Sequence, residues 1–139
     1  EPFTMNSDAF AKGQAIRRKV LGDAYVDSVS APRDAFSQEL QKYVAENCWG
    51  GIWSRPGLSL KTRSFLNLAM LSALVRPHEL KIHLRGALNN GITREEIAEV
   101  FLQTAMYCGT PAAVEAFRCA REVFADIDAT QSSPQRGSS

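Results

Sequence analysis

Three residues suited to acid–base and anion chemistry recur at helical spacing between Arg76 and Gly91. Arg76, Glu79 and His83 stand three and four positions apart, and residues at this spacing lie on one face of an α-helix. An imidazole can gain or lose a proton near neutral pH, since its unperturbed pKa is about 6.5. A carboxylate one turn away can orient the ring and favour its charged form. The stretch therefore predicts His83 as a proton donor, with Glu79 as its catalytic partner.

Non-catalytic interpretations of the same residues stay open on spacing alone. A single histidine on a helix is often a structural residue with satisfied hydrogen bonds. Glu79 can equally form a solvent-exposed ion pair with Arg76 or Arg85. Arg85 lies off the line of the other three residues, and it suits a surface or interface ion pair as well as an anion site.

A second stretch, residues 47–58, combines tryptophans with a cation. Its paired glycines and its Pro-Gly predict a loop. Trp49 and Trp53 either fill the core or wall a substrate pocket into which Arg55 points. A planar guanidinium grips a carboxylate through two parallel hydrogen bonds. The sequence thus offers three candidate substrate-binding cations: Arg55, Arg76 and Arg85.

The helices that must position these residues follow from apolar spacing and capping signals. The chain predicts about six helices and no strand pattern of comparable length, so the fold class is all-α. The helices are expected from Ser7 or Asp8 to about Val20, after Pro32 through Val44, from Leu60 to about Val75, from Pro77 to Asn89, from the Thr93–Glu96 capping box to Gly109, and from Thr110 to Ile127. We expect one helical domain over residues 7–127, between a disordered or vector-derived N-terminus (1–6) and a disordered tail (128–139).

The third of these helices bears on the number of subunits. Its latter half is apolar on every side, as in a helix that is buried on all faces. In a chain of 139 residues, this pattern predicts that a partner subunit covers one side. A homo-oligomer is therefore expected.

Composition narrows the classes of partner. The net charge is +1, with 22% charged and 45% hydrophobic residues, so neither nucleic acid nor an anionic membrane is an expected partner. The apolar run at 65–75 is too short to span a bilayer, and the N-terminus lacks a signal-peptide pattern.

The chain's three cysteines form neither a CxxC nor a metal-ligand pair; they are Cys48, Cys108 and Cys119. They are expected to be reduced, buried thiols in a cytoplasmic protein, and no metal site is predicted.

Three blocks of sequence together resemble the carboxymuconolactone decarboxylase family. They are RRKVLGDAYVD, WGGIWSRPGL and HLRGALNNGITREEIAEVFLQTAMYCGTPAAVEAFRCA, and they extend from about Gly13 to Phe124. The resemblance implies an AhpD-like all-α helical bundle that forms a trimer or hexamer. His83 matches the family's helix histidine. Peroxidase-type members have a CxxC before this histidine, where this chain has Arg76 and Glu79, so thiol peroxidase chemistry is not expected.

The reaction implied by the resemblance is the cofactor-free decarboxylation of 4-carboxymuconolactone to 3-oxoadipate enol-lactone, in protocatechuate breakdown by the β-ketoadipate pathway. The unsaturated lactone ring itself accepts the electrons of the breaking bond. The protein must then anchor the spare carboxylate with arginines, stabilise the enolate oxygen through Gly50-Gly51 backbone N–H groups or tryptophan indoles, and protonate a ring carbon from His83. General acid catalysis of that kind is typically worth ~10²–10⁴-fold.

Two other functions remain open at this stage. A related decarboxylase or isomerase could act on another lactone or keto acid, with Arg55 and the tryptophan stretch setting its specificity. A non-catalytic helical oligomer could instead bind a small carboxylate or a protein partner. Replacement of His83 separates these functions, because only an enzyme needs the proton that it carries.

Overall fold

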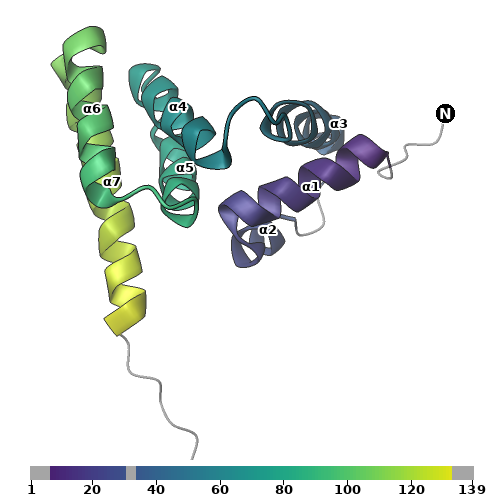
Figure 1. The fold of residues 1–139 in the computed structure, drawn as a ribbon. Coiled ribbons are helices and arrows are strands. Elements are labelled where there is room, and N and C mark those ends of the chain that lie inside the picture. The colour runs from purple at the N-terminus through teal and green to yellow at the C-terminus, as the bar shows by residue number, and fades with distance from the viewer. Residues whose placement is uncertain (1–6, 31–33, 133–139) are drawn as a thin grey trace, which may run out of the picture.

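The computed structural model describes residues 7–30 and 34–132, and these residues fold into helices without strands. The helices are α1 (Asp8–Leu21), α2 (Asp23–Val29), α3 (Gln38–Tyr43), the π-helix η1 (Val44–Trp53), α4 (Leu60–Ala73), α5 (Pro77–Asn89), α6 (Arg94–Cys108) and α7 (Thr110–Ser132). Figure 1 shows two groups: α1 to α3 with η1 on one side, and α4 to α7 on the other. The predicted all-α class is confirmed.

Two glycines let α1 and η1 pack backbone to backbone. A Cβ atom added at Gly13 would lie 1.9 Å from the Ala45 carbonyl oxygen, and one added at Gly50 would lie 2.4 Å from the Ala9 carbonyl oxygen. Both distances are far inside contact, so only glycine fits at these positions. The loop predicted at 47–58 is therefore wrong for residues 47–53, because the glycines there bring two helices together instead of ending one.

The four-helix group α4–α7 has its own core. Its largest fully buried side chains include Leu68, Leu80, Leu84, Ile97 and Phe101. Helix ends follow the predicted caps: the Ser59 hydroxyl accepts from the Thr62 N–H, and Thr93 forms both bonds of a capping box with Glu96. Predicted and observed bounds of α5 agree. Local signals were sufficient for the starts of α4, α5 and α6, which have a serine cap, a proline in the first turn and a capping box, respectively.

The N-terminal helices depart further from the sequence prediction. Gly22, with φ of +88°, ends α1, but the chain enters a further helix, α2, at the next residue, and α2 was not predicted. The helix predicted after Pro32 through Val44 begins only at Gln38, as α3, and the Phe36 side chain before it is 95% exposed.

The C-terminal helix continues beyond the predicted boundary. Helix α7 runs to Ser132, so the predicted disordered tail is wrong for residues 128–132. Asp128 forms an ion pair with Arg94 of α6 at 2.7 Å, and the Arg94 guanidinium lies 4.5 Å from the centre of the Phe124 ring. These contacts fasten the last turns of α7 to α6. Residues 1–6 and 133–139 lie outside the described residues.

Several apolar and thiol groups are exposed in the single chain. The outer side of α4 is open in the single chain, where Leu66, Met70 and Leu74 are 45%, 52% and 64% exposed. All three cysteines are free, but only Cys119 is buried, so the prediction of buried thiols is wrong for Cys48 and Cys108. Within residues 7–30 and 34–132, no helix is long and apolar enough to cross a membrane.

Candidate functional site

An aromatic cluster surrounds His83 where the two helical groups meet. The His83 ring stacks on both indoles, with ring centres 6.0 Å from Trp49 and 6.0 Å from Trp53 and interplanar angles of 12° and 17°. The two indoles stack on each other at 4.9 Å. Trp49 and Trp53 are 5% and 4% exposed, and Ile82 of α5 packs against their core. Both tryptophans therefore fill the core and, at the same time, form walls around the imidazole.

The π-helical backbone explains how both indoles reach the same ring. Trp49 and Trp53 are four residues apart in η1, and a π-helix has a wider turn than an α-helix, so such residues share one side. The close approach of α1 at Gly13 and Gly50 holds η1 in place. The sequence identified both tryptophans but placed them in a loop.

Asn67 is a site residue that the sequence analysis missed. Its side-chain nitrogen lies 3.3 Å from Nδ1 of His83. When the amide N–H donates to Nδ1, the ring carries its own proton on Nε2. One signal was available: Asn67 interrupts the apolar run at 65–75, and a buried polar side chain in such a run needs a partner.

Burial controls the charge of His83. Removal from water lowers the pKa of the imidazole to about 4, and the nearby Glu79 carboxylate opposes this shift without cancelling it. His83 is therefore neutral near pH 7 in the free protein. Glu79 was expected to orient the ring and favour the imidazolium. Its charge does favour the imidazolium, but desolvation has the larger effect on the pKa, and the hydrogen bond to the ring comes from Asn67.

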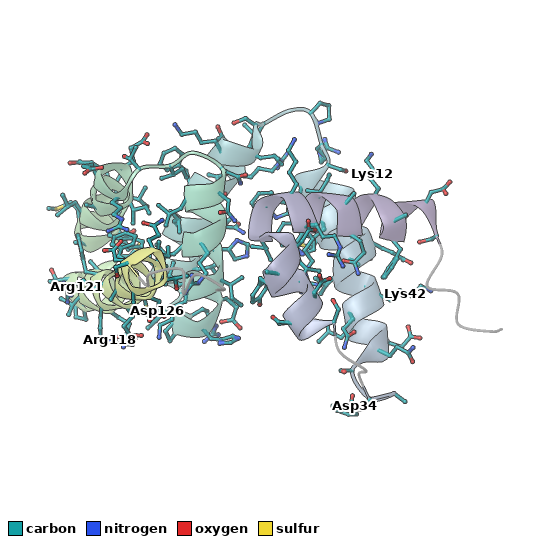
Figure 2. All side chains as sticks on the ribbon, turned by 90° about the horizontal axis from the view of Figure 1, so that it is seen from below. Lys12, Asp34, Lys42, Arg118, Arg121 and Asp126 are labelled. Atoms are coloured by element: carbon teal, nitrogen blue, oxygen red, sulfur yellow. The ribbon has the colours of Figure 1, made fainter. Side chains whose placement is uncertain are left out.

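The three predicted arginines do not gather around His83. Arg76 precedes α5 with φ of −114°, outside the helix, so the predicted single-face alignment holds only for Glu79 and His83. Arg55 is exposed, just beyond η1. Arg85, two residues after His83, points to another side of α5 and pairs with Asp126 of α7 at 3.5 Å. Figure 2 labels Asp126 on α7, in the helical group opposite α1.

A fourth arginine, Arg63, lies on the helix that carries Asn67. It stands one turn before Asn67 on α4, and its Nη2 donates to the Arg55 carbonyl oxygen at 3.2 Å. Its Nε is buried and has no hydrogen-bond partner among the described residues. The sequence analysis did not consider Arg63. The four-residue spacing from Asn67 was a possible signal, but only once Asn67 was known to contact His83.

A hollow beside the cluster has Trp49 in its wall. It has a volume of about 410 Å³ and is lined by α1, α3 and η1, with Gln14, Arg17, Gln41, Val44 and Trp49 among its walls. The Gln14 side-chain oxygen is buried there without a partner. Trp49 is the wall that this hollow shares with the imidazole. No group of three His, Cys, Asp or Glu side chains in the described part of the chain could hold a metal ion.

The sequence of the chain matches one protein family and several known proteins. The Carboxymuconolactone decarboxylase family matches residues 38–122. The chain is 40% identical over 118 residues to 4-carboxymuconolactone decarboxylase of Acinetobacter baylyi, covering 85% of this chain and 88% of that protein. It is 39% identical over 118 residues to nitrosuccinic acid decarboxylase npaB of Metarhizium robertsii, covering 85% and 82%. An uncharacterized 15.0 kDa protein of Paracoccus denitrificans is 37% identical over 88 residues, covering 61% and 65%. The family match includes η1, Arg63, Asn67 and His83.

Proposed function

The chain belongs to the carboxymuconolactone decarboxylase family, and from this premise we propose that it decarboxylates 4-carboxymuconolactone to 3-oxoadipate enol-lactone in protocatechuate breakdown. Two of its relatives are named as decarboxylases, which supports loss of CO2 as the reaction class. The structural observation that carries the proposal is His83, a partly buried imidazole stacked on two indoles and hydrogen-bonded to Asn67.

The substrate supplies its own electron sink. When the bond between the ring carbon and the leaving carboxylate breaks, CO2 departs and the electron pair enters the ring. It moves through the ring double bond to the lactone carbonyl oxygen, which gives a dienolate. A proton added to a ring carbon then forms the enol-lactone. The protein must therefore hold the second carboxylate, keep water from the breaking bond and deliver one proton.

In the proposed mechanism His83 takes up that proton when substrate binds. The free imidazole is neutral because burial lowers its pKa to about 4. A dianionic substrate beside the ring favours the imidazolium and raises this pKa. The Asn67 amide suits both states, since its nitrogen can donate to neutral Nδ1 and its oxygen can accept from protonated Nδ1. Stacked indoles exclude water, which strengthens the interaction between the imidazolium and the dienolate.

A second candidate substrate comes from the relative named for nitrosuccinic acid. Nitrosuccinate is also a dicarboxylate, and its nitro group can accept the electrons that CO2 leaves behind. Loss of CO2 followed by protonation at carbon would need the same imidazole and the same anchored carboxylate. We therefore define the substrate class as a small dicarboxylate whose leaving carboxylate is conjugated to, or beside, an electron sink.

Turnover on a substrate panel tests the proposal. Purified protein is incubated with 4-carboxymuconolactone, nitrosuccinate and a keto acid, and CO2 release is recorded beside the loss of lactone ultraviolet absorbance. The expected result is CO2 release in step with lactone loss. A folded protein that releases CO2 only from nitrosuccinate would support the second candidate, and one that acts on neither dicarboxylate would reject the proposed function.

The oligomer expected from the sequence also belongs to this proposal. We propose that copies of the chain associate through the exposed apolar side of α4 and the neighbouring α6, as a trimer or hexamer. Supporting residues are exposed in the single chain: Leu66, Met70, Leu74, Leu102, Met106 and Tyr107. Such a patch commonly marks a protein interface. Sedimentation equilibrium of the purified chain measures the mass directly, and a monomer at micromolar concentration would contradict the assembly.

A further inference from the structure

Arg63 shares a helix face with the asparagine that contacts His83. It lies on α4 four residues before Asn67, so both side chains leave the same face of the helix, about one 5.4 Å turn apart. Asn67 in turn contacts His83. The Arg63 Nη2 donates at 3.2 Å to the carbonyl oxygen of Arg55, two residues after Trp53. This hydrogen bond ties the guanidinium to the segment that follows η1.

The positive charge of Arg63 has no counterpart within the described chain. Its guanidinium forms no ion pair with an Asp or Glu among these residues, whereas Arg18, Arg85, Arg94 and Arg118 all do. Its Nε is buried without a hydrogen-bond acceptor. A buried donor without a partner is unfavourable, and the cost is greater when the group is charged. A ligand anion that pairs with an unsatisfied cationic donor gains more binding free energy than one that pairs with an already satisfied cation.

The hydrogen-bond geometry of an arginine suits a carboxylate here. Nη2 carries two hydrogens, so its bond to Arg55 leaves one free, and this hydrogen together with Nε–H can form a two-pronged contact with a carboxylate. The segment that supplies the Arg55 carbonyl is exposed from Arg55 to Leu58, so this side of the guanidinium borders solvent.

We propose that Arg63 binds the carboxylate that the substrate retains, and that it makes the site selective for dicarboxylates. The inference rests on the proposed function, because it assigns one carboxylate to Arg63 and leaves the other beside the indoles and His83. The single helical turn between Arg63 and Asn67 is comparable to the distance between the two carboxylates of a four- or five-carbon diacid.

Binding of inert diacids tests this assignment without turnover. Succinate and glutarate are compared with butyrate, and the emission of the chain's two tryptophans reports binding because both belong to the cluster. We expect the unmodified protein to bind the diacids more tightly than butyrate. Arg63→Gln should weaken diacid binding by about 10- to 100-fold, the usual range for a lost charge-assisted pair, and should leave butyrate binding within about twofold.

Two further variants keep the test decisive. Arg121→Gln removes an exposed arginine of α7, labelled in Figure 2, and should leave both affinities unchanged. Arg63→Lys keeps the charge without the planar fork, so it should retain part of the diacid preference. If Arg63→Gln does not fold, as judged by circular dichroism, Arg63→Lys decides, and diacid binding within twofold of the unmodified protein then overturns the proposal.

Each remaining outcome also has a defined meaning. Equal binding of diacids and butyrate by the unmodified protein overturns the role of Arg63, as does an Arg63→Gln protein that keeps its diacid preference. A changed sedimentation mass with unchanged diacid binding would assign Arg63 to a subunit contact and would overturn it too. The protein can also show diacid selectivity that depends on Arg63 and yet release no CO2. That result supports the binding role of Arg63 and rejects the proposed function.

Discussion

The two sides of α5 differ in the state of their ionisable side chains. On the side towards α7, Lys81 pairs with Glu122 and Arg85 pairs with Asp126, so each cation is neutralised within the chain. On the side towards η1, His83 is stacked against both indoles and kept neutral by desolvation. Paired surface cations contribute little and have little left to offer a ligand. The side towards η1 leaves its polar groups incompletely paired. A bound anion would therefore have its largest effect on the pKa and pairing of these groups.

Removal of His83 should produce the largest effect. His83→Gln is expected to lower kcat for CO2 release by ~10²–10⁴-fold, the usual range for loss of a general acid. His78→Ala offers a matched control, since it removes the chain's other histidine, which is exposed at the start of α5. Equal activity of the His83 variant and the control would mean that the buried side of α5 is merely structural.

Acid should destabilise the fold through the same imidazole. The pKa of His83 is about 4 in the folded protein and about 6.5 in the unfolded chain, so between these values the unfolded state binds more protons. Stability is therefore lost as pH falls from 6.5 to 4, by roughly 3 kcal/mol for this residue. Urea unfolding at pH 7 and pH 4 measures the loss, and His83→Gln should lose less by about that amount. Parallel losses in both proteins would show that His83 is not desolvated.

A charge placed beside His83 should shift its titration. Asn67→Asp puts a carboxylate where the amide now contacts Nδ1, and this favours the imidazolium. The pKa of His83 should rise by roughly 1–3 pH units, which NMR titration of the imidazole protons can follow. Asn67→Leu serves as the uncharged comparison and should not raise it. If both variants titrate alike, the contact between Asn67 and the ring is not maintained in solution.

The paired side of α5 should give the smallest effect. Arg85→Gln breaks an ion pair between exposed side chains, and such pairs contribute about 0–1 kcal/mol to stability. We expect the free energy of unfolding to fall by less than about 1 kcal/mol, with kcat/KM almost unchanged. Thermal unfolding and steady-state kinetics measure both quantities. A large rise in KM would show that Arg85 binds the substrate. The two sides of α5 would then not differ in their availability to a ligand.

Much of α4 to α7 was predictable because their signals are local. The cap at Ser59, the capping box at Thr93 and Pro77 at a first helical position each fix a helix start. The one-turn spacing of Glu79 and His83 follows from helix geometry alone. The N-terminal group was less predictable, because glycines that allow close helix packing have the same local pattern as glycines that end a helix.

The sequence by itself determined the helical class, the register of α5, the candidate histidine and the resemblance to a decarboxylase family. Only the tertiary structure decided that Arg85 is paired, that Asn67 contacts the imidazole, and that the Nε of Arg63 is buried without an acceptor among the described residues. Helix formation depends on neighbours within about one turn. Desolvation and charge pairing depend instead on groups brought together from distant helices, and these set the pKa of His83 and the availability of each arginine.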